Sequence, residues 1–247
     1  MEKPGRREVI FLLGSAAATT LVGGAGEAAT SMESPAGSSP GQAAPGCVVT
    51  PEQTEGPYFV EEGLNRRDIR VDPSTGVVKA GVPLALTLRL QQVSRGACTP
   101  LGGTLVDVWH CDAGGVYSDV RDRRFNTAGQ KFLRGHQVSD ASGLVTFQTI
   151  YPGWYTGRAV HLHFKVRTNP AGSRGLEFTS QLYFDEAITD AVHARPPYNS
   201  KGRRDVLNAA DGMYRGGGRL LTLPLVAQGG GYAATFDIAV QTGRTAL

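Results

Sequence analysis

Hydrophobic and polar positions alternate along several short stretches of the chain. The clearest stretch has leucine at every second position from Leu84 to Leu90, with small or polar residues between them. Because successive side chains of a strand point to opposite faces of a sheet, this pattern predicts a half-buried strand. Further strands are expected over 105–111, 144–150, 161–167, 178–184 and 236–240. A short helix is expected within 200–214.

Turn-forming segments separate these expected strands. Asp112-Ala113-Gly114-Gly115 follows one strand, and Asp140-Ala141-Ser142-Gly143 precedes another. Short strands at regular spacing, divided by Gly and Pro turns, are typical of two packed antiparallel sheets. The sequence therefore predicts an all-β fold, an antiparallel β-sandwich with long loops. It contains no dinucleotide-binding fingerprint and no phosphate-binding loop.

The first 46 residues have a different composition from the rest. Arg6-Arg7 precedes a short apolar run and then a series of small residues. This order predicts an export signal over 1–29, a flexible linker over 30–46 and one domain over 47–247. The paired arginines favour the twin-arginine route, and a general secretory signal is the alternative. We therefore expect an exported protein, secreted or in the cell envelope, with no membrane association after signal removal.

Charge and cysteine content narrow the possibilities. The 247-residue chain has a net charge of +3 and scattered basic residues, which give no reason to expect nucleic-acid binding. Export permits disulfides, so we expect Cys47, at the start of the domain, to pair with Cys98 in a turn-like segment. The alternative is that all three cysteines stay reduced. Cys111 lies in an apolar strand and is expected to be a buried thiol.

The strand over 161–167 carries the most informative polar residues. Its apolar side chains share one face, and His161 and His163 share the other. Two imidazoles at this spacing can reach a single zinc, copper, iron or nickel ion. An isolated pair would more often be two exposed histidines, but Arg158 and Tyr155 precede this pair closely. A Pro-Gly turn just before Tyr155 can fold its phenol back toward the histidine face.

A second group of polar residues lies in the segment 106–118. There an expected strand runs into a glycine turn that delivers Tyr117. Taken alone, such a tyrosine is more often a core or surface residue. His110 is a possible further metal ligand, although packing within the strand is the favoured interpretation.

Four segments together resemble the intradiol dioxygenases, which include catechol and protocatechuate dioxygenases. In chain order they are Thr54-Glu55-Gly56-Pro57-Tyr58, the segment 106–118, the array Tyr155-x-x-Arg158-x-x-His161-x-His163, and Gln181-Leu182-Tyr183-Phe184. The resemblance covers about residues 47–184. One of these segments would be a weak signal, whereas four in this order are a strong one.

The resemblance implies a metal centre carried by the long loops of the sandwich. One non-haem Fe(III) per chain would be held by four ligands, Tyr117, Tyr155, His161 and His163. Phenolates are hard anionic ligands, and two of them favour Fe(III) over Fe(II). The implied activity is cleavage of a catechol-type ring between its two hydroxylated carbons, with O2 and the catechol as substrates and a muconate-type diacid as product.

The resemblance also implies roles for neighbouring residues. Tyr155 would leave the iron and help to accept a proton, while Tyr117 would stay bound. Arg158 would stabilise charge that develops on the ring, and Gln181 would support Arg158 or the substrate. The substrate pocket would be formed by Gly56, Pro57, Tyr58 and Trp154.

Two other classes of protein remain possible from the sequence. One is an exported β-sandwich module that binds aromatic or cell-wall ligands without turnover. The other is a zinc hydrolase, which the tyrosines fit poorly because catalytic zinc uses three His or carboxylate ligands and a water. The sequence leaves open the oligomeric state, the preferred catechol and the role of the region after Asp185.

Overall fold

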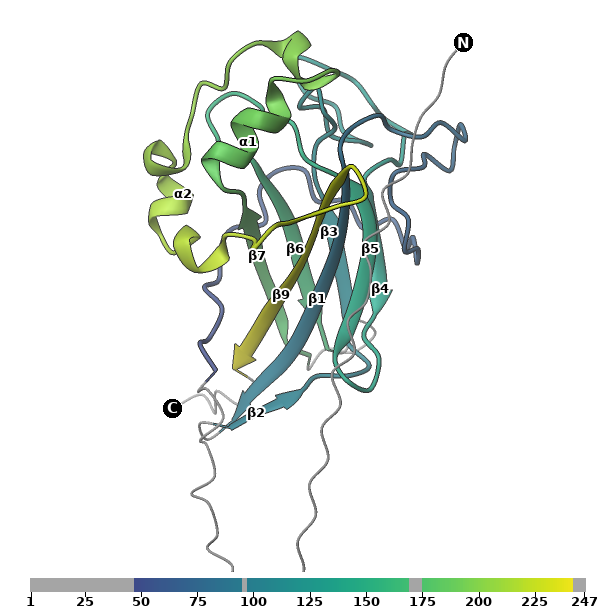
Figure 1. The fold of residues 1–247 in the computed structure, drawn as a ribbon. Coiled ribbons are helices and arrows are strands. Elements are labelled where there is room, and N and C mark those ends of the chain that lie inside the picture. Colours follow the sequence, from purple (N-terminus) through teal and green to yellow (C-terminus); the bar gives the residue numbers. More distant parts are fainter. Residues whose placement is uncertain (1–46, 95–96, 169–174, 242–247) are drawn as a thin grey trace, which may run out of the picture. The chain divides into compact units, whose positions relative to one another are not determined.

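Two β-sheets form the framework of the chain in the computed structural model (Figure 1). The structure describes residues 47–94, 97–168 and 175–241, all within one unit, Ala43–Leu247. The expected export signal and linker lie outside the described residues. The strands are β1 Pro83–Ser94, β2 Ala97–Pro100, β3 Leu105–Trp109, β4 Arg134–Val138, β5 Leu144–Ile150, β6 His161–Arg167, β7 Glu177–Tyr183, β8 Val226–Gln228 and β9 Gly231–Gln241.

The two sheets have different strand orders. One has the order β2-β1-β9-β8, and the second has the order β4-β3-β6-β7. In the first sheet, β2 pairs with the end of β1 and β5 pairs with its beginning, both along the same edge. The predicted all-β sandwich is confirmed. Its pairs are antiparallel except for β1 and β9, which run parallel over ten residue pairs from Leu84↔Tyr232 to Val93↔Gln241. β9 returns beside β1 after the chain has passed through β6 and β7 of the other sheet.

Helical segments connect β7 to β8, and Figure 1 shows α1 at one end of the sheets. They are α1 Glu186–His193, η1 Tyr198–Lys201, η2 Asn208–Ala210, α2 Gly212–Arg215 and η3 Gly218–Leu221. The short helix expected within 200–214 corresponds to η2 and the start of α2. None of the described helices combines the length and the apolar character needed to cross a membrane.

Alternating side chains of both sheets form the core. The leucines of β1 expected to be buried are at most 1% exposed, and Leu162, Phe164 and Val166 of β6 pack in the same cluster. At the start of the described chain, Cys47 forms a disulfide with Cys98, and their Cα atoms are 6.0 Å apart. Cys111 is a free, buried thiol, and burial raises its pKa to about 12.

Candidate active site

The candidate site lies on the side of β6 that faces away from the sandwich core. His161, His163 and Lys165 alternate with the core residues of β6. Such residues on an outer sheet face would ordinarily be exposed. Instead, His161 is 2% and His163 1% exposed, so another part of the chain covers this face.

The segment 51–59 provides that cover. The backbone N–H of Gln53 donates to the carbonyl of Thr179 at 2.9 Å, and the hydroxyl of Ser180 donates to the carbonyl of Pro51 at 2.7 Å. Further on, Phe59 packs edge-on against Trp109, with ring centroids 4.9 Å apart. The site therefore lies between the sheet and the segment 51–59, which is hydrogen-bonded to β7. This arrangement shields the two histidines from solvent.

The two histidines face each other through their Nε2 atoms, which are 3.1 Å apart. Nδ1 of His161 lies 2.7 Å from the carbonyl of Ala159. Since a carbonyl only accepts, the proton of His161 sits on Nδ1 and its Nε2 carries a lone pair. Burial lowers the pKa of His161 to about 3 and that of His163 well below its ordinary value. Both imidazoles are therefore neutral and able to bind a metal.

Two loops bring tyrosines to the same place. The hydroxyl of Tyr155 lies 3.2 Å from Nε2 of His161. Tyr117 is 1% exposed, with its ring centroid 5.7 Å from that of Tyr155 and 6.2 Å from that of His163. Burial raises the pKa of Tyr155 to about 12 and that of Tyr117 well above its ordinary value. Burial outweighs the opposing effect of the nearby Arg158, so without a bound metal ion both phenols remain protonated.

These four side chains fit a hard metal ion. The hydroxyl of Tyr117 is buried without a hydrogen-bond partner among the described residues, and a bound ion is one of the partners that would satisfy such a group. Ligands of one first-row ion, each about 2 Å from it, lie about 3 Å apart, as the two Nε2 atoms do. Within the described ranges, no three His, Cys, Asp or Glu side chains cluster to hold a metal, so the tyrosines are needed to complete the set.

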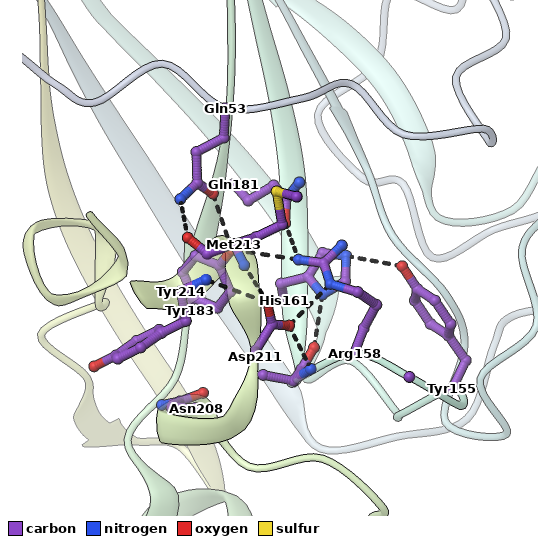
Figure 2. A network of polar contacts seen from close by, with 12 residues as sticks. Gln53, Tyr155, Arg158, His161, Gln181, Tyr183, Asn208, Asp211, Met213 and Tyr214 are labelled. Atoms are coloured by element: carbon purple, nitrogen blue, oxygen red, sulfur yellow. Dashed lines mark hydrogen bonds and ion pairs between the residues drawn. The ribbon is translucent and has the colours of Figure 1, made fainter. Parts of the chain in front are cut away.

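Arg158 lies beside this group in a network of polar contacts (Figure 2). Its Nε donates to Oδ2 of Asp211 at 2.8 Å, and its Nη2 donates to Oε1 of Gln181 at 2.6 Å and to the hydroxyl of Tyr183 at 3.3 Å. Gln181 in turn donates through Nε2 to the carbonyl of Thr54 at 2.9 Å. In the described part of the chain, Nη1 of Arg158 has no protein acceptor.

Asp211 is a site residue that sequence reasoning missed. It lies 53 positions after Arg158, in the region that the sequence left uninterpreted, and no motif surrounds it. Its side chain is the N-cap of α2, accepting from the backbone N–H groups of Met213 and Tyr214. An Asp before a short helix is a recognisable capping signal, but it does not indicate which arginine the carboxylate would meet.

The residues expected to line the pocket have different surroundings. The Tyr58 ring stacks on Tyr117 at 4.5 Å, and its hydroxyl donates to Oδ2 of Asp122 at 2.9 Å. Gly56 has a φ of +73°, and a Cβ there would lie 3.4 Å from Cε1 of His163. Pro57, the next residue, is exposed.

Trp154 and His110 lie outside the group of candidate ligands. The half-buried Trp154 packs against the sandwich core, under the ammonium group of Lys201. His110 is buried, with Nδ1 2.7 Å from the carbonyl of Cys111 and Nε2 2.6 Å from the hydroxyl of Thr149. Both nitrogens of His110 are therefore already engaged, as a packed strand histidine requires.

Comparison with known proteins agrees with this geometry. A family model described as Dioxygenase matches residues 54–211. The chain is 30% identical to an intradiol ring-cleavage dioxygenase from Tetranychus urticae, with a TM-score of 0.68 over 79% of this chain and 95% of that one. It is 28% identical, with a TM-score of 0.55, to the dioxygenase domain of a dioxygenase carbohydrate-binding protein fusion from Streptomyces sp. SirexAA-E, over 79% of this chain and 100% of that one.

A curated relative points the same way. The protocatechuate 3,4-dioxygenase beta chain of Burkholderia cepacia is 32% identical over 138 residues, which are 52% of this chain and 56% of that protein. The chain thus spans about half the length of this curated relative. The β-sandwich therefore has the fold of a dioxygenase. The chain belongs to the intradiol ring-cleavage dioxygenase family, as its motifs predicted.

Proposed function

We propose that the protein is a non-haem Fe(III)-dependent dioxygenase. It would cleave catechol-type rings between the two hydroxylated carbons, consuming O2 and giving muconate-type diacids. The observation that carries this proposal is the convergence of two tyrosines and two histidines in one dry site beside a fixed arginine. Tyr117, Tyr155, His161 and His163 would hold one iron per chain.

Bound Fe(III) would act as a Lewis acid and template that makes the catechol ring reactive toward O2. The two tyrosines would then differ in role because they differ in burial. Tyr155 is only half-buried and its hydroxyl contacts His161, which supports a role as the ligand that leaves and takes up a proton on Oη. Tyr117 is fully enclosed under the Tyr58 ring, which supports a permanent ligand.

Arg158 would stabilise the negative charge that develops on the ring. Its guanidinium is held through Nε by Asp211 and through Nη2 by Gln181. A cation fixed before the reaction needs no reorganisation when charge appears, and it acts strongly where water is excluded. Gln181 would therefore support Arg158 and would not contact the substrate directly.

Tyr58 and Gly56 would form the wall of the substrate pocket. The ring of Tyr58 is held by stacking on Tyr117, and its hydroxyl is held by a hydrogen bond to Asp122. Gly56 leaves open the space beside His163 that a side chain would fill. Both features favour a flat aromatic substrate in this space.

The test is a visible absorption spectrum of the purified protein together with metal analysis of the same sample. Tyrosinate bound to Fe(III) gives a broad charge-transfer band, which should shift when catechol is added without oxygen. Near one iron per chain and a shifting band are the expected result. An iron-reconstituted protein without the band would refute the proposal and favour a module that only binds aromatic ligands.

Export is a separate proposal that rests on the leader sequence. Arg6-Arg7 and the apolar run behind them support a twin-arginine signal over 1–29. Cell fractionation of the wild type and an Arg6→Lys, Arg7→Lys variant tests it. Export unaffected by the double substitution would exclude the twin-arginine route.

A further inference from the structure

One carboxylate at the edge of the site, that of Asp211, accepts four hydrogen bonds (Figure 2). Oδ2 accepts from Nε of Arg158 and from the backbone N–H of Ala159, both at 2.8 Å. Oδ1 accepts from the backbone N–H groups of Met213 at 2.7 Å and Tyr214 at 3.2 Å. An ionised carboxylate offers about four lone-pair positions, so all of them are in use, and the residue is 2% exposed.

Capping of α2 does not by itself require an aspartate. Ser, Thr or Asn cap helices about as well, and the cap of α2 uses only Oδ1. The second oxygen and the charge serve Arg158, whose side chain is 20% exposed while that of Asp211 is 1% exposed. A buried ion pair of this kind is costly to break because one charge would be left without a partner.

The same oxygen connects Arg158 to a histidine of the candidate metal centre. Oδ2 of Asp211 holds the N–H of Ala159, and the carbonyl of Ala159 accepts from Nδ1 of His161 at 2.7 Å. The position of Oδ2 therefore sets both the plane of the guanidinium and the backbone that orients the imidazole. With Nε and Nη2 engaged, only Nη1 of Arg158 is left to face a substrate.

We propose that Asp211 is the positioning residue of this centre, acting through Arg158 on the reacting ring. This inference rests on the proposed dioxygenase function. Asp211 determines which nitrogen of Arg158 faces the substrate, and it holds that nitrogen in a fixed position relative to His161. Misplacement of a catalytic group by about 1 Å can lower a rate about a hundredfold, so Asp211 would affect turnover without touching substrate.

Two substitutions separate this role from helix capping. Asp211→Asn keeps the shape of the side chain, but its NH2 group must face either the two cap donors or the pair formed by Arg158 and Ala159. Asp211→Ser keeps a good N-cap for α2 and removes the contact with Arg158. Asp72→Asn is the matched control, because Asp72 is buried to a similar degree, at 3% exposed, and accepts from Ser74 and from the N–H of Lys131, outside the candidate site.

The experiment uses the full chain loaded with iron, with catechol as probe and oxygen uptake as readout. Rates are expressed per bound iron, and kcat and KM are determined separately. Both Asp211 variants should retain iron and the charge-transfer band and lose about ten- to hundredfold in kcat, with a smaller change in KM. The Asp72→Asn variant should keep the kcat of the wild type even if its melting temperature falls.

A double-mutant cycle with Arg158→Lys shows whether Asp211 acts through Arg158. If it does, the double variant should be no slower than Arg158→Lys alone, because coupled residues are not additive. Additive losses, or Asp211 variants within threefold of the wild-type kcat, would overturn the inference. Failure of the proposed function is distinct, because the wild type itself would then bind no iron or leave catechol unchanged.

Discussion

The hydroxyl of Tyr117 is an anomaly at the scale of a single residue. It is buried without a hydrogen-bond partner in the described part of the chain, whereas the hydroxyl of Tyr155 contacts His161. An unsatisfied buried polar group costs about 1–3 kcal/mol. Tyr117→Phe should therefore leave the metal-free protein as stable as the wild type, or more stable by about 1 kcal/mol, and should abolish stoichiometric iron binding.

Tyr198→Phe provides the matched control for this prediction. Tyr198 is equally buried, but its hydroxyl accepts from the N–H of Val82 at 2.9 Å and donates to the carbonyl of Tyr151 at 2.8 Å. Its loss should lower the unfolding free energy by about 1 kcal/mol and leave iron binding unchanged. Chemical denaturation and metal analysis measure both quantities. Equal destabilisation by the two substitutions would mean that the Tyr117 hydroxyl has a partner in the protein.

At the scale of elements, one ammonium group joins the two loops that carry the tyrosines. Nζ of Lys201, in η1, donates to the carbonyls of Gly114 and Trp154, both at 2.7 Å. Gly114 lies in the turn before Tyr117, and Trp154 directly precedes Tyr155. The loops approach so closely that a Cβ on Gly115, whose φ is +80°, would lie 2.0 Å from the carbonyl oxygen of Trp154.

Lys201→Met should loosen this junction while filling the space of the lysine stem. Loss of charge-assisted hydrogen bonds predicts a decrease of about 2 kcal/mol in unfolding free energy and faster release of iron to a chelator. Lys131→Met is the control, because the ammonium of Lys131 pairs with Glu62 and not with the carbonyls of Gly114 and Trp154. If both variants released iron at the wild-type rate, the junction would have no part in holding the tyrosines.

The elements also show what the sequence could predict. The histidines of β6 and the leucines of β1 were predictable because strand periodicity alone decides which face each occupies. β4 was not predicted, since Arg134 and Gly135 interrupt any alternation, and Arg134 is buried through hydrogen bonds to Ser118. The parallel pairing of β1 with β9, like the contact of Asp211 with Arg158, depends on chain crossings that no local pattern records.

For the whole molecule, buried neutral histidines tie stability to pH. His110 is 1% exposed with both nitrogens engaged, and burial lowers its pKa from 6.5 to about 4. Between these two values the unfolded chain binds a proton that the folded protein does not. The contribution of His110 is therefore fully present above pH 6.5 and is lost as the pH falls toward 4. The expected slope is about 1.4 kcal/mol per pH unit.

Chemical denaturation of the metal-free wild type and of His110→Gln between pH 4.5 and 8 isolates this contribution. Glutamine can keep one hydrogen bond but cannot titrate. Below pH 6.5 the unfolding free energy of the variant should therefore fall less steeply with decreasing pH, by the slope that corresponds to about one bound proton. Above pH 6.5 the two curves should run parallel, and their separation there gives the pH-independent cost of the substitution. Parallel curves over the whole range would show that His110 does not titrate differently on unfolding. Acid sensitivity would then come from the other buried histidines, His161, His163 and His193, whose pKa values are also lowered by burial. Adding iron should suppress the part that comes from His161 and His163.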